Sequence, residues 1–112
     1  MSVLNVTDAE FNEVLKKHKD VIVKYYTDWC GACRMFSPIY EKLSEDKRYK
    51  NIKFLEVNME HDPGARSKAA IDFIPYLATF QNGEFYEGHA TTQEKVVVTM
   101  LEELVHHEVE QY

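Results

Sequence analysis

The sequence predicts an α/β fold in which a mixed β-sheet carries helices on both faces. Two apolar segments, 21–27 and 52–59, have the composition of interior strands, and segments of helical periodicity alternate with them. The chain then closes with a hairpin and a long helix. The predicted order is therefore β-α-β-α-β-α-β-β-α, in which the hairpin adds an antiparallel pair to strands joined through helices. We expect a single domain over residues 1–112, because the chain has an ordinary domain length.

The first elements are a short strand, a capped helix and an interior strand. Residues 3–6 have the composition of a strand, and Thr7 with Glu10 fits a capping box at the start of a helix. Four side chains share one face of this helix: Phe11, Val14, Leu15 and His18. Residues 21–27 combine β-branched and aromatic side chains without clean alternation, which predicts a strand covered on both faces.

The middle of the chain predicts a second helix, a second interior strand and a short third helix. Pro38 lies inside the second helix, and we expect a kink there because proline lacks the backbone donor and clashes with the carbonyl of Arg34. Residues 52–59 form the interior strand. Residues 62–64 then predict a turn into a short helix over residues 65–70, with Pro63 at its first turn.

The last part predicts a hairpin and a long helix. Pro75 opens a strand, at one of the few positions where a strand tolerates proline. Asn82-Gly83 is a strong signal for a tight hairpin turn into a strand over residues 84–86. Thr91 or Thr92 then caps the long helix. Its buried face consists of Val97, Met100, Leu101, Leu104 and Val105.

Composition and charge exclude several classes of function. A hydrophobic fraction of 45% is enough to fill a core, and the formal net charge of −6 argues against a surface for nucleic acid or anionic membrane. The longest purely apolar runs, such as Val21-Ile22-Val23, are far too short to span a bilayer. The first residues lack a basic region followed by an apolar stretch, so no signal peptide is predicted and we expect a cytoplasmic protein.

Cys30 and Cys33 are the two cysteines of the sequence, and they lie where the strand over residues 21–27 runs into the next helix. A lone pair excludes a scaffold held together by disulfides. In a reducing compartment such a pair indicates catalysis or metal binding rather than a structural bridge. The spacing alone therefore leaves a redox dithiol and half of a metal site open.

Around Trp29-Cys30-Gly31-Ala32-Cys33 the sequence resembles the thioredoxin family. Arg34-Met35-Phe36-Ser37-Pro38 is similar to the family's continuation, and Phe73-Ile74-Pro75 lies where the family carries its cis-proline. Asn82-Gly83-Glu84 matches the turn of the last hairpin, and the element order agrees from about Val3 to about Val105. The resemblance implies the thioredoxin fold. It also implies a protein thiol–disulfide oxidoreductase that exchanges a dithiol and a disulfide through a mixed-disulfide intermediate.

The sequence departs from the usual pattern of this family near the motif. Ala32 replaces the usual proline or histidine. Lys24 lies where the family usually has a buried acid, and Glu56 lies where a lysine usually partners that acid, so the charge pair is inverted. Phe73 replaces a small residue, and Tyr76 replaces a common threonine.

The two cysteines are expected to have different roles. Cys30 is at a helix start, where free amides and the helix dipole favour a thiolate, so we interpret it as the attacking thiol. Cys33 lies one turn further along the same side, so we interpret it as the resolving thiol. Ala32 and Lys24 should both favour the dithiolate form. We therefore expect a potential less reducing than the value of about −270 mV given for thioredoxin.

The resemblance also implies a groove for the substrate chain beside the dithiol. The residues expected around it are Trp29, Gly31, Ala32, Ile74, Pro75 and Tyr76. Trp29 would form a lid, and Pro75 in the cis form would abut the dithiol and leave the backbone of Ile74 free to pair with substrate. The reactive group would be the disulfide itself, with no cofactor and no metal. The implied partners are protein disulfides and a thioredoxin reductase-type electron donor, and we expect a monomer that binds neither nucleic acid nor membrane.

Lys24 admits three interpretations. It pairs with Glu56 as a buried ion pair, since buried charges are rarely left unpaired. Alternatively, it lies below Cys33 and favours the thiolate of that residue. In the third interpretation its ammonium group reaches solvent along a less covered strand face. In the first two, Glu56 becomes the candidate proton acceptor for Cys33, through water, in place of the missing acid.

Two other classes of function compete with the oxidoreductase. In one, the fold is a protein-binding module with an incidental dithiol, and the edge formed by Ile74-Pro75-Tyr76 docks the partner. In the other, two subunits hold zinc or an iron–sulfur cluster through their cysteines, an arrangement that Pro75 beside the sulfurs would hinder. Fast, pH-dependent alkylation of Cys30 with reduction of insulin favours the enzyme. Ordinary thiol reactivity favours the module, and bound zinc or visible colour favours the metal protein.

Overall fold

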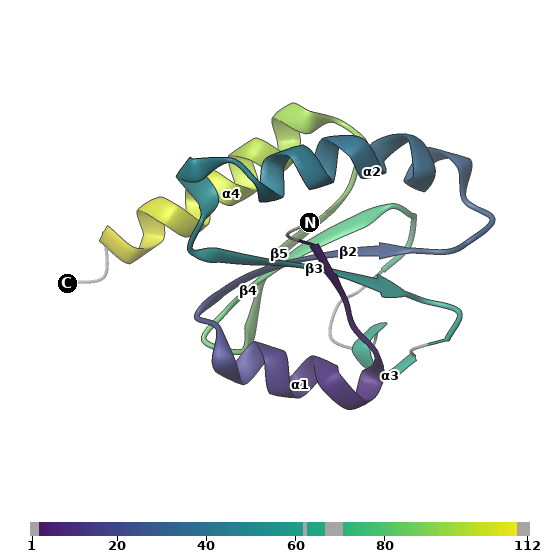
Figure 1. The fold of residues 1–112 in the computed structure, drawn as a ribbon, viewed down its shortest axis with the longest axis horizontal. Coiled ribbons are helices and arrows are strands. Elements are labelled where there is room, and N and C mark those ends of the chain that lie inside the picture. Colours follow the sequence, from purple (N-terminus) through teal and green to yellow (C-terminus); the bar gives the residue numbers. More distant parts are fainter. Residues whose placement is uncertain (1–2, 62, 67–70, 110–112) are drawn as a thin grey trace.

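The computed structural model describes residues 3–61, 63–66 and 71–109. Within these residues one sheet (Figure 1) contains β1 (Val3–Asn5), β2 (Asp20–Tyr26), β3 (Ile52–Asn58), β4 (Tyr76–Gln81) and β5 (Glu84–Ala90). The helices are α1 (Asp8–Lys17), α2 (Gly31–Ser44), α3 (Pro63–Arg66) and α4 (Glu94–Val109), with a 3₁₀ turn η1 (Lys47–Tyr49) after α2. The predicted α/β order is confirmed, with the 3₁₀ turn added between α2 and β3.

The sheet is mixed, as predicted, and β2 is its central strand. The strand order is β1-β3-β2-β4-β5. β1 and β2 both run parallel to β3, whereas β4 runs antiparallel to β2 and to β5. β2 is therefore hydrogen-bonded along both edges, and all of its residues except Tyr26 are buried.

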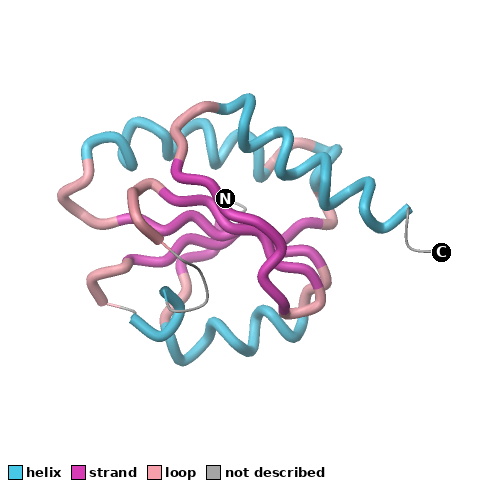
Figure 2. The backbone as a smooth tube through the Cα atoms, turned by 180° about the vertical axis from the view of Figure 1, so that it is seen from behind, coloured by secondary structure: helices cyan, strands magenta, loops and turns pink. Residues whose placement is uncertain are grey.

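Helices cover both faces of this sheet. α2 and α4 lie on one face, and α1 and α3 lie on the other (Figures 1 and 2). Ile22 and Phe54 join the apolar cluster under α2 and α4, while Tyr25 and Val57 join the cluster on the α1 face. Because side chains alternate along a strand, Lys24 of β2 lies on the α2 face. No helix in the described part of the chain combines the length and apolar character of a membrane span.

The hairpin between β4 and β5 confirms the turn predicted from Asn82-Gly83. Asn82 has a φ of 55° and Gly83 a φ of 83°, the two positive values that a type I′ turn requires. β5 extends to Ala90, well beyond the strand predicted over residues 84–86. A β-carbon at Gly88 would collide with the ring of Tyr76, so this position of β5 needs glycine.

Two helix starts differ from the prediction. α3 begins at Pro63 rather than at residue 65, and residues 67–70 of the predicted helix lie outside the described residues. α4 begins at Glu94, and the carbonyl of Gln93 accepts its first hydrogen bonds. The hydroxyl of Thr91 accepts from the backbone N–H of Gln93 at 3.0 Å, so it stabilises the turn before the helix instead of the helix itself.

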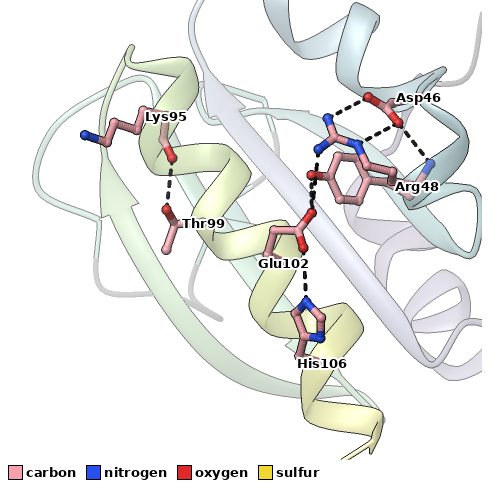
Figure 3. A network of polar contacts seen from close by, with 7 residues as sticks. Asp46, Arg48, Lys95, Thr99, Glu102 and His106 are labelled. Carbon is pink, nitrogen blue, oxygen red and sulfur yellow. Dashed lines mark hydrogen bonds and ion pairs between the residues drawn. The ribbon is translucent and has the colours of Figure 1, made fainter.

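A charged network joins η1 to α4 at the end of α2 remote from the cysteines (Figure 3). The guanidinium of Arg48 donates to both carboxylate oxygens of Asp46, at 3.1 and 2.8 Å. Arg48 also lies 3.9 Å from Glu102 of α4, and the hydroxyl of Tyr49 donates to that carboxylate at 2.6 Å. His106 contacts Glu102 at 3.2 Å one helical turn further on. The charged groups of the network are partly or fully exposed at the surface, whereas the ring of Tyr49 is buried.

Candidate active site

The two cysteines lie at the junction of β2 and α2, as predicted. Cys30 is the N-cap residue of α2, and its backbone N–H donates to the carbonyl of Thr27 at 3.3 Å. Cys30 and Cys33 are joined by a disulfide, with 5.3 Å between their Cα atoms. The Cys30 Sγ also accepts from the N–H of Cys33 at 3.1 Å. An amide of the first helical turn is therefore already directed at this sulfur, as the stabilisation of a thiolate requires.

The two sulfur-bearing residues differ in exposure. Cys30 is 6% exposed and Cys33 is 2% exposed. The flanking residues Gly31 and Ala32 are both exposed, and nothing lies within 4 Å of a β-carbon built on Gly31. Both cysteines are buried, and the exposed surface beside them is formed by Gly31 and Ala32, so the roles of the two thiols stay a prediction.

Lys24 and Glu56 form the predicted ion pair. They are direct neighbours in the parallel register of β2 and β3, and the Lys24 Nζ lies 3.3 Å from the Glu56 carboxylate. The side chain of Lys24 is 2% exposed, whereas that of Glu56 is 28% exposed. The interpretation in which Lys24 reaches solvent is therefore wrong. The strand is covered here by α2, and the ammonium group lies between the rings of Tyr26 and Tyr40, with centroid distances of 5.5 and 5.4 Å.

Ser37 connects this pair to the dithiol, a role that the sequence analysis missed. Its hydroxyl accepts from the Lys24 Nζ at 2.7 Å and donates to the carbonyl of Cys33 at 3.1 Å. Ser37 lies four residues after Cys33, so the two share one face of α2. That spacing is the signal that identifies Ser37 once Lys24 is placed beneath the same helix.

A cavity of about 210 Å³ brings the buried pair and the inner cysteine together. Its lining includes Cys33, Lys24, Glu56, Ser37 and Asp28. A water molecule occupies roughly 30 Å³ of liquid, so the space suffices for a short water path between Glu56 and Cys33. The influence of Lys24 on the Cys33 thiolate stays a prediction, because its ammonium group is directed at Glu56 and Ser37.

The Ile74–Pro75 peptide bond is cis, as the resemblance implied. Pro75 directly precedes β4, and Tyr76 pairs with Tyr25 near the carboxyl end of β2. Pro75 therefore lies at the same end of the sheet as the loop that leads to Cys30. Its carbonyl accepts from Thr91 at 3.2 Å, which ties the loop before β4 to the segment before α4. Direct contact between Pro75 and the sulfurs stays a prediction.

The predicted groove residues separate into exposed and buried groups. Trp29 is 69% exposed, so it is not an ordinary core residue, and Ile74 is partly exposed. Tyr76 differs from the prediction. It is 7% exposed, its ring lies edge-on to that of Tyr25, and burial raises its pKa. Its side chain therefore belongs to the core, whereas the neighbouring Phe73 is exposed at this end of the sheet.

The sequence and the structure both have known relatives. The sequence profile of the family described as Thioredoxin matches residues 2–104. A thioredoxin of Rickettsia bellii is 43% identical over 81 residues, covering 71% of this chain and 76% of the relative. A thioredoxin-like protein of Synechocystis is 33% identical over 107 residues, covering 93% of this chain and 97% of the relative. Among solved structures, a thioredoxin of Plasmodium falciparum has a TM-score of 0.81 at 26% identity and covers 89% of this chain and 97% of its own.

Proposed function

Because the chain belongs to the thioredoxin family and is a thiol–disulfide oxidoreductase, we propose that Cys30 is the attacking thiol and Cys33 the resolving thiol. The arrangement at the start of α2 supports these roles. Cys30 is the N-cap residue and the more exposed of the two cysteines, and an amide of the first turn already donates to its sulfur. Cys33 is buried within reach of that sulfur, as the disulfide between them demonstrates.

The exchange consumes one substrate disulfide and yields two substrate thiols. The Cys30 thiolate attacks one sulfur of the substrate, the substrate S–S bond breaks, and the first substrate thiolate leaves. A mixed disulfide now joins Cys30 to the second substrate sulfur. Cys33 loses its proton and attacks the Cys30 sulfur, which releases the second substrate thiolate. The substrate gains two electrons and the protein is left with the Cys30–Cys33 disulfide.

Glu56 is the proposed acceptor of the Cys33 proton, with Lys24 as its charge partner. The second step needs a base near a buried thiol, and two carboxylates, Glu56 and Asp28, line the cavity with Cys33. Glu56 is chosen because it pairs with buried Lys24, whereas Asp28 is exposed and accepts from Asn58. Its partial exposure lets the proton continue to solvent after transfer. Lys24 holds this carboxylate in place and also donates to Ser37, one helical turn from Cys33.

The substrate chain is proposed to lie along the loop before β4. Ile74 is partly exposed beside the cis-proline and lines two adjoining surface cavities. Its backbone would pair with an extended substrate segment. Trp29, Gly31 and Ala32 would contact the same segment from the side of the dithiol.

Protein substrates and a reductase-type electron donor are the proposed partners. One solved structural neighbour is a thioredoxin f2 in complex with a ferredoxin:thioredoxin reductase. Another comes from a study of a yeast mitochondrial peroxiredoxin and its thiol-resolving mechanism through glutathione and thioredoxin systems. By analogy, this chain would receive electrons from a reductase and pass them to protein disulfides. We propose that it acts as a monomer, without a cofactor, in the cytoplasm.

Single-cysteine variants test the assigned roles. Cys30→Ser should abolish the reduction of insulin disulfides, because the attacking sulfur is lost. Cys33→Ser should still attack a substrate disulfide but should stop at the mixed disulfide, which mass spectrometry would detect. Trapping by Cys30→Ser and not by Cys33→Ser would reverse the assignment.

A glutathione redox titration tests the predicted potential. Ala32 and the buried Lys24 should make the pair less reducing than about −270 mV. The ratio of dithiol to disulfide can be measured by alkylation after equilibration with defined glutathione buffers. A potential at or below that value would contradict the prediction.

A further inference from the structure

An open pocket of about 500 Å³ lies next to the dithiol and is formed by three segments of the chain. Trp29 comes from the loop after β2, Met59 and Glu60 follow β3, and the segment 71–74 precedes β4. This volume lies within the range of about 300–1,000 Å³ that is usual for pockets that bind small groups. The pocket also shares Phe73 and Ile74 with the cavity on the other side of the loop. It is therefore continuous with the proposed position of the substrate chain.

Two large aromatic side chains form exposed walls of this pocket. Trp29 is 69% exposed and Phe73 is 72% exposed. Large exposed apolar patches often mark binding sites on soluble proteins, and both of these side chains line the same pocket. Phe73 is also the residue that replaces the small side chain usual in the resembled family at this position. The aromatic wall formed by Phe73 is therefore specific to this chain, because the resemblance predicts a small side chain there.

The charged groups of the pocket are carboxylates. Glu60 and Asp72 line it and both are exposed, and among the residues that the structure describes no Lys, Arg or His lines the pocket. Within the described ranges, neither carboxylate has a cationic partner. The whole chain carries a formal net charge of −6, which adds to the negative potential here. In the described part of the chain, the pocket therefore contains carboxylates and no cationic side chain to pair with them.

We propose that this pocket binds an arginine side chain of the protein substrate, close in sequence to the attacked cysteine. The faces of tryptophan and phenylalanine attract a cation, and the guanidinium stacks on them better than an ammonium does. Its fork of N–H donors also pairs with carboxylates in two-point geometry, which Asp72 and Glu60 could accept. A neutral apolar side chain would contact the two aromatic rings, but it would form no ion pair with Asp72 or Glu60.

This inference rests on the proposed function, because the substrate main chain at Ile74 delivers the arginine to the pocket. The subsite would determine which disulfides react fastest. It would not change the chemistry of Cys30 and Cys33. The expected preference is for protein disulfides with a basic residue near the cysteine, and arginine should be preferred to lysine.

Synthetic peptide disulfides test the proposal. Each peptide carries one cysteine and one test residue, which is arginine, lysine, leucine or citrulline. The test residue is moved from three residues before the cysteine to three residues after it. Citrulline has the shape of arginine without its charge. At one position or more, kcat/KM for the arginine peptide should exceed that for the citrulline peptide by roughly three- to tenfold, as expected for an exposed cation–π contact with an ion pair. The ratio should fall in high salt.

Matched variants connect the preference to the pocket. Asp72→Asn combined with Glu60→Gln, and separately Phe73→Ala, should bring the arginine-to-citrulline ratio close to one. Glu45→Gln is the charge control, because Glu45 is an exposed acid after the far end of α2. Met35→Ala is the apolar control, because Met35 is 81% exposed but does not line this pocket. Both controls should keep the ratio.

Three outcomes would overturn the proposal. Equal rates for arginine and citrulline peptides at every position would exclude a cation subsite while leaving the proposed function intact. Faster reduction of the leucine peptides would instead indicate an apolar subsite. If no peptide were reduced, although the Cys30–Cys33 pair could be reduced and alkylated, both the inference and the proposed function would fail.

Discussion

The two charged networks at opposite ends of α2 use the same kinds of groups in different surroundings. Beneath Cys33, Lys24 is 2% exposed and contacts Glu56 and Ser37. Beyond the other end of the helix, Arg48 is 60% exposed and contacts Asp46 and Glu102 (Figure 3). Glu56 is 28% exposed, so water and salt still reach the first network, but they screen it less than the second because Lys24 is buried and Arg48 is not. An ion pair therefore matters for stability and chemistry here only where the fold excludes water from one of its charges.

The largest predicted difference between the networks is in stability. Glu56→Ala leaves the buried ammonium of Lys24 without its carboxylate, and this should lower the free energy of unfolding by about 2–4 kcal/mol. Asp46→Ala removes a carboxylate whose ionic partner is exposed and that caps η1 through the backbone N–H of Arg48, so it should cost less than Glu56→Ala. Urea denaturation of the reduced proteins measures both changes.

The double variant Lys24→Met with Glu56→Leu provides the control for that result. Replacing both charges by apolar groups removes the unpaired ion, so most of the stability lost in Glu56→Ala should return. If the double variant were as unstable as Glu56→Ala, packing rather than charge would account for the loss.

A second prediction compares two hydroxyls that make the same local hydrogen bond. Ser37 donates to the carbonyl of Cys33 and Thr99 donates to that of Lys95, each four residues earlier in its helix. Only the Ser37 hydroxyl also accepts from buried Lys24. Ser37→Ala should therefore cost about 1–2 kcal/mol of unfolding free energy, and Thr99→Ala less than about 0.5 kcal/mol. Equal losses would show that Lys24 does not depend on Ser37.

The smallest predicted effect is the acid titration of the exposed network. Hydrogen bonding from Arg48 lowers the pKa of Asp46 to about 2. A lowered carboxylate pKa contributes stability that is fully present above the unfolded value, near 3.9, and is lost as the pH falls through the folded value. The contribution should therefore disappear between about pH 4 and pH 2. NMR titration of the Asp46 carboxyl carbon checks this, and a midpoint near 3.9 would show that the contact with Arg48 does not persist in solution.

Strand periodicity and the proline and glycine signals were sufficient to predict most of the fold. The pairing of Lys24 with Glu56 was predicted from the resemblance, because the two residues lie where the family has an acid and its partner lysine. Ser37 was missed because its role depends on how α2 packs over β2, which the spacing within one helix does not reveal. Tyr76 was placed in the groove because the resemblance puts it directly after the cis-proline, whereas its side chain packs against Tyr25 in the core. The prediction that Pro63 lies in the first turn of α3 is confirmed, but the predicted bounds began at residue 65 and the helix begins at Pro63 itself.

The role of the buried pair in catalysis is tested by the rate at which Cys33 resolves a mixed disulfide on Cys30. The mixed disulfide can be formed with a chromogenic thiol, whose release is followed in a single turnover from pH 6 to 9. In Glu56→Gln, resolution at pH 7 should be slower by about tenfold or more, because general base catalysis is lost. The deficit should shrink as rising pH ionises Cys33 without assistance. The control variant Glu102→Gln, in the network at the other end of α2, should resolve the mixed disulfide at the rate of the unmodified protein. An unchanged rate in Glu56→Gln at every pH would contradict the assignment of Glu56 as the proton acceptor.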